Sequence, residues 1–185
     1  MKKALLLASV ILLTTNAMAL TDISIGVYGG LNMPIVQDDA KSGTGFGLKA
    51  KFAPSPIIGF SAFFESRSFG DAEITVPVGG QDVTMTSPGG KISVFGAEGM
   101  IGNVAGGVGP HFYWMLGISN YKWTRDGYSD LSKVGYHLGP GVEIGFPSNI
   151  GVEAKAKFEI VPTDGGGSRK NILIFLGANY HFGLM

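Results

Sequence analysis

Apolar and charged residues alternate without interruption along Ile150–Ile160. In an extended strand successive side chains point to opposite faces, so this segment has one apolar face and one charged face. The charged face carries Glu153, Lys155, Lys157 and Glu159. A soluble barrel would bury the apolar face, whereas a transmembrane barrel would turn it toward lipid and the charges toward its interior. The alternation alone does not distinguish these two architectures.

Eight segments of strand character run along the chain, joined by alternating short turns and longer connections. The predicted strands are Ile23–Met33, Gly45–Phe52, Ile58–Arg67, Ile92–Ile101, Val108–Tyr121, Val134–Phe146, Ile150–Ile160 and Ile172–Phe182. Strands of about ten residues, with tight turns such as Gly102–Gly107 at one end and longer loops at the other, are typical of an outer-membrane barrel. The predicted fold class is therefore all-β, an eight-stranded antiparallel up-and-down transmembrane β-barrel with both chain ends at the short-turn, periplasmic end.

The longest connection, Ser68–Gly90, contains a hairpin of its own. Apolar residues alternate on both sides of Gly79-Gly80, which marks a two-residue turn. The residues of this candidate partner-binding hairpin are Glu73, Ile74, Val76, Val78, Val83 and Met85. An exposed strand edge can add a strand from a partner, which suits adhesion or the binding of a foreign protein. The alternative is a passive extension of the barrel rim, with Pro77 blunting the edge.

The start of the chain indicates export. Residues 1–19 have a basic start, a short apolar run and a final Ala17-Met18-Ala19, which is typical of a cleaved signal peptide, and residues 20–185 then form one barrel domain. The apolar run is shorter than the roughly 20 residues that a membrane-spanning helix needs. The chain has no cysteine, and its 14 basic residues balance 14 acidic ones. Disulfides, thiolate metal sites and nucleic-acid binding are therefore not expected.

The charged residues on the non-apolar strand faces form two sets of equal size. The predicted lumenal network consists of Lys49, Lys51, Arg67, Lys155 and Lys157 with Glu65, Glu98, Glu143, Glu153 and Glu159. Because a narrow barrel has little room for water, a balanced set that pairs across the lumen is far less costly than unpaired charges. Glycines on the same faces, Gly47, Gly59, Gly141 and Gly151, are expected to leave space for these long side chains. The alternative is the solvated outer face of a soluble barrel.

Three segments carry a family resemblance. The run Gly135–Glu143, the alternating Ile150–Phe158 and the closing Gly177–Phe182 resemble the last three strands of small outer-membrane β-barrels of the OmpA/OmpX-like superfamily. The resemblance implies location in the cell outer membrane of a Gram-negative bacterium and insertion by the outer-membrane assembly machinery. It also implies that Tyr180 and the terminal aromatic Phe182 are the assembly signal. This chain departs from the pattern because three residues follow Phe182.

The sequence offers little chemistry. His111, His137 and His181 fall on the predicted lumenal faces, and Ser132 lies close to His137 in sequence, but no motif joins them. A lipid A-modifying barrel enzyme is therefore an alternative function, and no catalytic residue, cofactor or metal site is predicted. A narrow pore for small solutes is a further alternative, although Phe63, Tyr113 and Phe175 should nearly close it.

The function that the sequence favours is structural or surface-interacting, adhesion-like and without enzymatic activity. The expected partners are outer-membrane lipid and lipopolysaccharide, the assembly machinery during insertion and an extracellular protein. No nucleic acid is expected, and the protein is expected to be a monomer.

Overall fold

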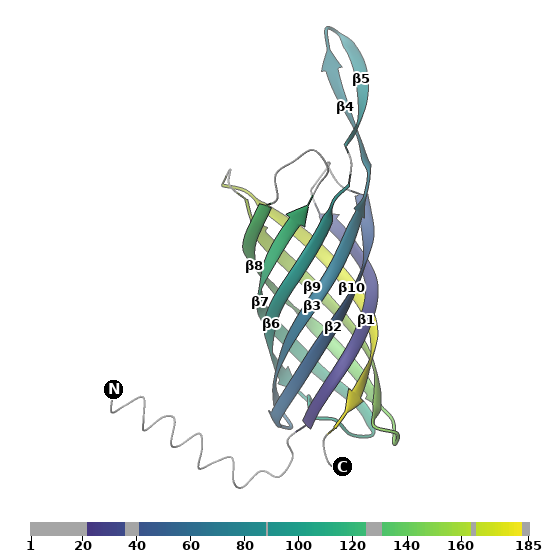
Figure 1. Ribbon diagram of the computed structural model, residues 1–185, viewed down its shortest axis with the longest axis vertical. Helices are drawn as coiled ribbons and strands as arrows, with labels where there is room; N and C mark the ends of the chain where they lie inside the picture. Colours follow the sequence, from purple (N-terminus) through teal and green to yellow (C-terminus); the bar gives the residue numbers. More distant parts are fainter. Residues whose placement is uncertain (1–21, 36–40, 88, 125–130, 164–165, 183–185) are drawn as a thin grey trace, which may run out of the picture.

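Eight antiparallel strands close into a barrel in the computed structural model of the chain, which describes residues 22–35, 41–87, 89–124, 131–163 and 166–182 (Figure 1). The predicted signal peptide lies outside the described residues. The barrel strands are β1 (Asp22–Ile35), β2 (Lys41–Ser55), β3 (Ile58–Gly70), β6 (Lys91–Gly102), β7 (Gly109–Thr124), β8 (Leu131–Gly145), β9 (Ile150–Pro162) and β10 (Ser168–His181). Around the barrel the order is β1, β10, β9, β8, β7, β6, β3, β2. The predicted fold class is confirmed.

The remaining two strands form the predicted hairpin. Strands β4 (Ala72–Val78) and β5 (Gln81–Ser87) pair only with each other, as a separate two-stranded sheet. They continue β3 and β6 beyond the rim, so the hairpin stands clear of the barrel at its outer end (Figure 1). Gly79 and Gly80 both have positive φ, 62° and 85°, which is the backbone of a type I′ turn.

The barrel strands are longer than the ten residues predicted. They contain 12 to 16 residues, and most of the excess lies at the end that carries the hairpin. The predicted loop from Lys122 to Lys133, for example, is strand at both of its ends, because β7 runs to Thr124 and β8 begins at Leu131. Cross-strand pairing continues wherever backbone groups find partners, and polar outward side chains are suited to strand segments that extend beyond the hydrocarbon layer.

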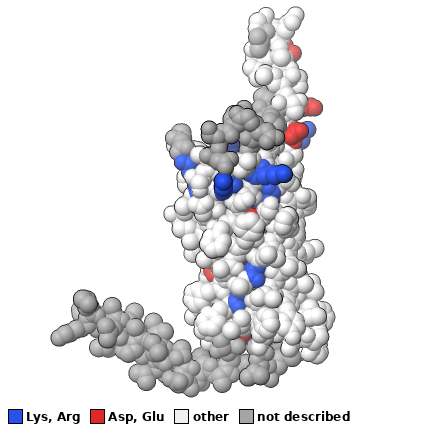
Figure 2. All heavy atoms as spheres, viewed as in Figure 1, with Lys and Arg blue, Asp and Glu red and all other residues white. Residues whose placement is uncertain are grey.

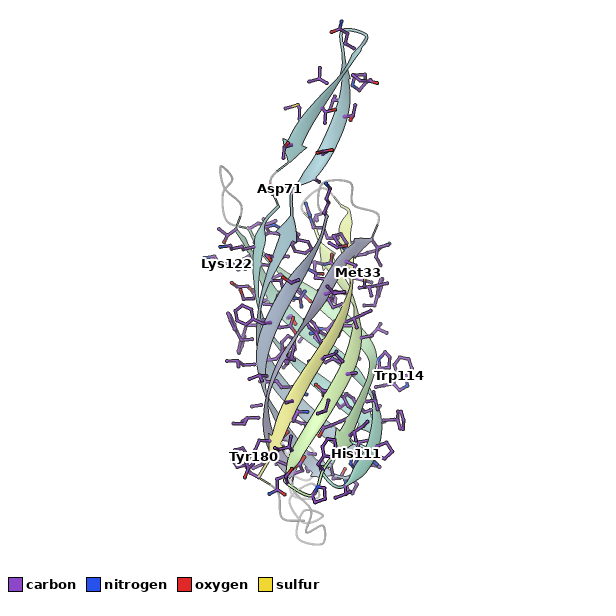
Figure 3. The ribbon with its side chains drawn as sticks, turned by 90° about the vertical axis from the view of Figure 1, so that its right-hand side faces the viewer. Met33, Asp71, His111, Trp114, Lys122 and Tyr180 are labelled. Atoms are coloured by element: carbon purple, nitrogen blue, oxygen red, sulfur yellow. The ribbon has the colours of Figure 1, made fainter. Side chains whose placement is uncertain are left out.

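The wall has the polarity of a membrane barrel. Outward side chains such as Trp114 and Leu116 are 59% and 65% exposed, whereas the charged inward side chains Lys157 and Glu159 are almost completely buried. Trp114 and Tyr180 point away from the barrel in Figure 3. A soluble domain shows the reverse arrangement, so the alternative of a soluble barrel with solvated charges is wrong. No helix among the described residues is long and apolar enough to cross a membrane.

The connection between β6 and β7 differs from the tight turn predicted at Gly102–Gly107. The segment folds back beneath the barrel, so that Val104 is 2% exposed. The Val104 N–H donates to the Pro56 carbonyl (2.8 Å), and Lys51 Nζ donates to the Val104 carbonyl (3.1 Å). The physical reason is that Val104 joins an apolar cluster with Met100 and Tyr113, which a tight turn would leave uncovered. The described chain ends meet at this same end, where the Phe182 N–H donates to the Ile23 carbonyl (2.7 Å).

Candidate functional site: the ion-paired lumen and the outer hairpin

All ten predicted lumenal charges lie inside the barrel. Each of these residues is at most 5% exposed. Alternation along each strand fixes this placement, because inward and outward positions cannot exchange without a register shift. The charges lie in an outer, a middle and a periplasmic group along the barrel, and Tyr28 contacts both the outer and the middle group.

The outer group is built around Arg67 on β3. Its guanidinium donates two hydrogen bonds to the Glu159 carboxylate (2.6 and 2.7 Å) and further bonds to Glu65, including one from Nε (2.9 Å). Lys157 Nζ lies 2.5 Å from Glu65 Oε1, and the Tyr28 hydroxyl donates to the same oxygen (2.7 Å). Strand β9, which carries Glu159, lies opposite β3 in the ring of eight strands. The Arg67–Glu159 pair therefore spans the lumen.

The middle group contains the one predicted cation that makes no hydrogen bond among the described residues, Lys155. Its ammonium lies 3.7 Å from the centre of the Tyr28 ring and 5.9 Å from the rings of Phe63 and Phe175. Aromatic faces are negatively polarised, so this cage partly replaces the missing hydrogen-bond acceptors. Glu98 lies in the same group and accepts a hydrogen bond from Ser61 Oγ (2.9 Å).

The periplasmic group joins both ends of the chain. His181 near the C-terminus contacts Asp22 near the N-terminus (2.9 Å) and Glu143 (2.5 Å). Lys51 lies 3.4 Å from Glu143 and 3.7 Å from Asp22. Lys49 pairs with Glu153, which also accepts the Tyr113 hydroxyl.

Several members of these groups were not predicted from the sequence. They are Tyr28, Ser61, the ion-pair partner Asp22 and Asn179, which donates to Glu143 (2.7 Å). Tyr113 was predicted as an aromatic residue in the lumen, but not as a hydrogen-bond donor to Glu153. The signal that could have found Asp22 is present in the sequence, because extending the alternation of the first predicted strand by one residue places Asp22 on the lumenal face.

Buried apolar side chains pack beside the charged groups toward both ends of the barrel. Toward the hairpin end this cluster consists of Phe63, Phe69, Ile92, Val94, Tyr121 and Val161. Toward the periplasmic end it consists of Ala53, Met100, Val104, Tyr113 and Met115. At the outer mouth Trp123 stacks on Phe69, with ring centres 5.5 Å apart, and the Arg169 guanidinium lies 4.3 Å from the Trp123 ring. Side chains thus occupy the lumen at these heights, as expected of a narrow eight-stranded barrel.

The lumenal glycines serve a different purpose from the one predicted. A Cβ atom at Gly141 would lie 2.3 Å from the Tyr113 ring, and one at Gly47 would lie 2.6 Å from the Tyr28 ring. A Cβ at Gly59 would meet Met100 and Val104. Of the four predicted glycines, only Gly151 makes room for a charged side chain, Glu143. Wide rings near a strand need more lateral space than extended lysine chains. The prediction that these glycines make room for charged side chains is therefore wrong for all but Gly151.

His137 and Ser132, which lie close together in the sequence, do not contact each other. Ser132 is exposed on the outer wall and donates to Asn120 (3.0 Å), whereas His137 is buried in the lumen. His137 Nε2 instead lies 3.1 Å from Glu98 Oε2, and its Nδ1 lies 3.4 Å from Ser119 Oγ. This serine, histidine and acid order resembles that of a hydrolase, but Ser119 and His137 are buried in the lumen, at 3% and 1% exposed.

Among the described residues, no group of three or more histidine, aspartate or glutamate side chains is arranged so that it could hold a metal ion.

The outer hairpin has one apolar face and one polar face. Its register pairs Val76 with Val83 and Ile74 with Met85 on one face, and Thr75 with Thr84 on the other, where the two hydroxyl oxygens are 3.3 Å apart. Val76, Val83 and Met85 are 39%, 41% and 59% exposed. These apolar side chains stand beyond the barrel rim, in water. Asp71 anchors the base of the hairpin by accepting a hydrogen bond from the Gly89 N–H (2.7 Å), and it lies where the hairpin leaves the barrel in Figure 3.

The residues of the predicted assembly signal lie on the outer wall at the periplasmic end. Tyr180 and Phe182 are 46% and 56% exposed, and their rings meet edge to face with centres 5.0 Å apart. Both side chains thus lie on the outward surface of β10 and its extension.

Comparison with known proteins gives a structural likeness and no sequence match. No family model matches the chain, and no curated protein matches it. The β-barrel domain of Pseudomonas aeruginosa OprF is 12% identical with a TM-score of 0.58, and covers 87% of this chain and 97% of its own. Neisserial surface protein A (NspA) is 13% identical with a TM-score of 0.59, covering 88% and 97%. Ail of Yersinia pestis is 18% identical with a TM-score of 0.51, covering 89% and 100%.

At these identities the likeness concerns the fold, which spans nearly the whole of each chain. The chain therefore shares the fold of these eight-stranded outer-membrane β-barrels, and its apolar outer wall is what that fold needs in a bilayer.

Proposed function

We propose that the protein is a monomeric barrel with a closed lumen that presents the β4–β5 hairpin to a protein partner outside the cell. The observation that carries this proposal is the exposure of Val76, Val83 and Met85 beyond the rim. Outward apolar residues on the barrel wall are covered by lipid, but those on the hairpin are not. Exposed apolar side chains grouped on a water-facing element favour an interaction surface.

The filled lumen supports a structural role for the barrel itself. A solute channel needs a continuous water-filled path, and two clusters of buried apolar side chains occupy parts of the lumen. A hydrolytic site needs access for its substrate, and Ser119 and His137 are only 3% and 1% exposed. The barrel thus serves as a rigid support for the hairpin.

Deletion of the hairpin tests this function. Gly70 would be joined to Gly90 through a short glycine linker, and bacteria carrying the intact or the shortened protein would be compared for attachment to surfaces coated with extracellular matrix and serum proteins. We expect the deletion to remove the attachment that the intact protein confers. The shortened barrel should keep its heat-modifiable gel mobility, which shows that it still folds. Equal attachment by both strains would exclude the hairpin as an adhesive element.

The rim supports a second contact, with the lipid headgroups of the outer leaflet. Lys91, Lys122 and Lys170 are exposed at the strand ends near the hairpin, and Figure 2 shows lysine and arginine gathered at this rim with few charged atoms on the wall below. Cations at this height suit the phosphates of lipopolysaccharide. If this contact forms, lipopolysaccharide added to the folded protein should raise its unfolding temperature, and Lys91→Gln with Lys122→Gln should reduce that rise. An equal rise in the variant would refute the contact.

The last proposed partner is the outer-membrane assembly machinery, which would recognise Tyr180 and Phe182 while it inserts the barrel. Replacing Phe182 by Ala should lower the amount of folded barrel in the membrane without changing the stability of the barrel that does insert. Unchanged membrane levels would show that this aromatic is not the signal.

A further inference from the structure

The two outer edges of the hairpin are not equivalent. Since β4 and β5 pair only with each other, each has one edge without a neighbouring described strand. The backbone groups that face each edge follow from the turn. Val78 and Gln81 flank the two-residue turn, so they form a hydrogen-bonded pair whose N–H and C=O groups face each other.

Hydrogen-bonded and non-hydrogen-bonded pairs then alternate down the hairpin. The next pair, Pro77 with Asp82, is therefore non-hydrogen-bonded, and the backbone groups of both residues point outward. The same holds for Thr75 with Thr84. A proline at such a position is consistent with this assignment, because proline in a sheet is confined to places where no ladder N–H is needed.

Pro77 makes the β4 edge a poor template. It has no N–H, so the run of outward donors on β4 is interrupted close to the hairpin tip. The β5 edge presents Asp82, Thr84 and Thr86 without a proline. Its donors and acceptors are therefore uninterrupted along the length of the hairpin.

The charge of the hairpin indicates the chemistry of its partner. Residues 72–87 carry two carboxylates, Glu73 and Asp82, and no lysine or arginine. Both acids are exposed and lie on the polar face together with Thr75 and Thr84. A strand added beside β5 would place alternate side chains next to Asp82 and Thr84 on one face, and next to Val83 and Met85 on the other.

We propose that β5, and not β4, is the edge at which the hairpin receives its partner, and that the partner is an extended protein segment in which apolar and basic residues alternate. Backbone hydrogen bonds would supply affinity, the apolar positions would cover Val83 and Met85, and the basic positions would neutralise Asp82. This inference rests on the proposed function of the hairpin and specifies the edge and the partner.

A matched pair of proline substitutions tests the edge. Thr84→Pro removes an outward N–H from β5, and Thr75→Pro removes the equivalent N–H from β4. Because Thr75 and Thr84 face each other, both variants lose the same hydroxyl contact and leave the inner ladder intact. The probe is a short synthetic peptide of alternating valine and lysine, added to the full barrel in nanodiscs of zwitterionic lipid, with a valine and glutamate peptide as control. Heat-modifiable gel mobility checks that each variant folds.

We expect the valine and lysine peptide to bind the unaltered protein and the Thr75→Pro variant with similar Kd, and the Thr84→Pro variant about tenfold more weakly, which corresponds to one lost backbone hydrogen bond. Amide hydrogen exchange should slow at Thr84 and Thr86 when the peptide binds, and not at Thr75. The control peptide should bind far more weakly.

Any other pattern would overturn the inference. Weaker binding only in Thr75→Pro would assign the partner to β4, and equal weakening in both variants would indicate the apolar face. Binding unaffected by either proline would indicate attraction by charge alone, and equal binding of the control peptide would exclude the basic partner. Absence of binding to the unaltered protein would refute strand addition of this chemistry. The attachment assay with the hairpin deletion would still decide the proposed function separately.

Discussion

The Arg67–Glu159 pair allows the energetics of the lumen to be tested with two substitutions. Both hydrogen bonds of the Glu159 carboxylate come from Arg67, at 2.6 and 2.7 Å, and both side chains are fully buried. Arg67→Met therefore leaves a buried carboxylate without its partner. Hydrogen bonds to charged groups contribute roughly 1.5–3 kcal/mol each, and breaking a buried ion pair costs about 3–5 kcal/mol. We expect the free energy of unfolding to fall by about 3–5 kcal/mol.

The reciprocal change should cost less. In Glu159→Met the guanidinium keeps its hydrogen bonds to Glu65, so the expected loss is about 2 kcal/mol. The double variant removes both charges together, and Glu65 retains Lys157, so its stability should lie within about 1 kcal/mol of the unaltered protein.

Urea unfolding in lipid vesicles, followed by tryptophan fluorescence and gel mobility, measures all three values. The exposed Lys91→Met serves as the matched control and should change stability by less than about 0.5 kcal/mol. We expect the loss of stability in the double variant to be much smaller than the sum of the two single losses. If the loss in the double variant equals the sum of the two single losses, the pair does not act as a unit and the lumen is not stabilised by mutual neutralisation.

Three further predictions concern the packing, the wall and the closed interior. Gly141→Ala should lower the free energy of unfolding by about 1–3 kcal/mol, because its Cβ would collide with the Tyr113 ring. In the same urea titration Gly99→Ala should be nearly neutral, because the nearest atom to its Cβ would be 4.0 Å away. Leu116→Arg places a charge on the lipid-facing wall and should cost about 2–4 kcal/mol, while Ser93→Arg near the rim should cost at most about 1 kcal/mol; equal losses would contradict the assigned bilayer position. In planar bilayers the purified barrel should show no stable, sizeable conductance. Sustained openings would contradict a lumen that is filled by side chains.

Strand number, pairing order and wall polarity could be predicted because alternation is a local property. Each residue on a strand lies on the face opposite its neighbour, so Glu153 and Lys155 had to share a face with each other whatever the rest of the chain did. The choice of lipid or water for the opposite face came from the export signal and the balance of charges. The outward apolar side chains are exposed and the inward charged side chains are buried, which confirms that choice.

Contacts across the lumen could not be predicted from the sequence. Which carboxylate meets Arg67 depends on the shear of the closed barrel, which sets how far each strand is displaced along its neighbour. The role of Gly141 was misread for the same reason, since its opposing ring, Tyr113, lies on the neighbouring strand at a height that only the register defines. The predicted strands were too short because the alternation of apolar and polar residues weakens where the outward residues become polar, as at Lys122 and Ser132.

The ion pairs that cross the barrel also bear on how the chain enters the membrane. An open sheet made of β1 to β3 would already hold Lys49, while the carboxylate that neutralises it, Glu153, arrives only with β9. Arg67 would have Glu65 on its own strand but would lack Glu159, which also lies on β9. Bare ions are very costly in the interior of a bilayer. A half-built sheet therefore has no stable resting place in lipid. Insertion has to release a finished cylinder, or shield the incomplete one until β10 reaches β1 and the seam is sealed.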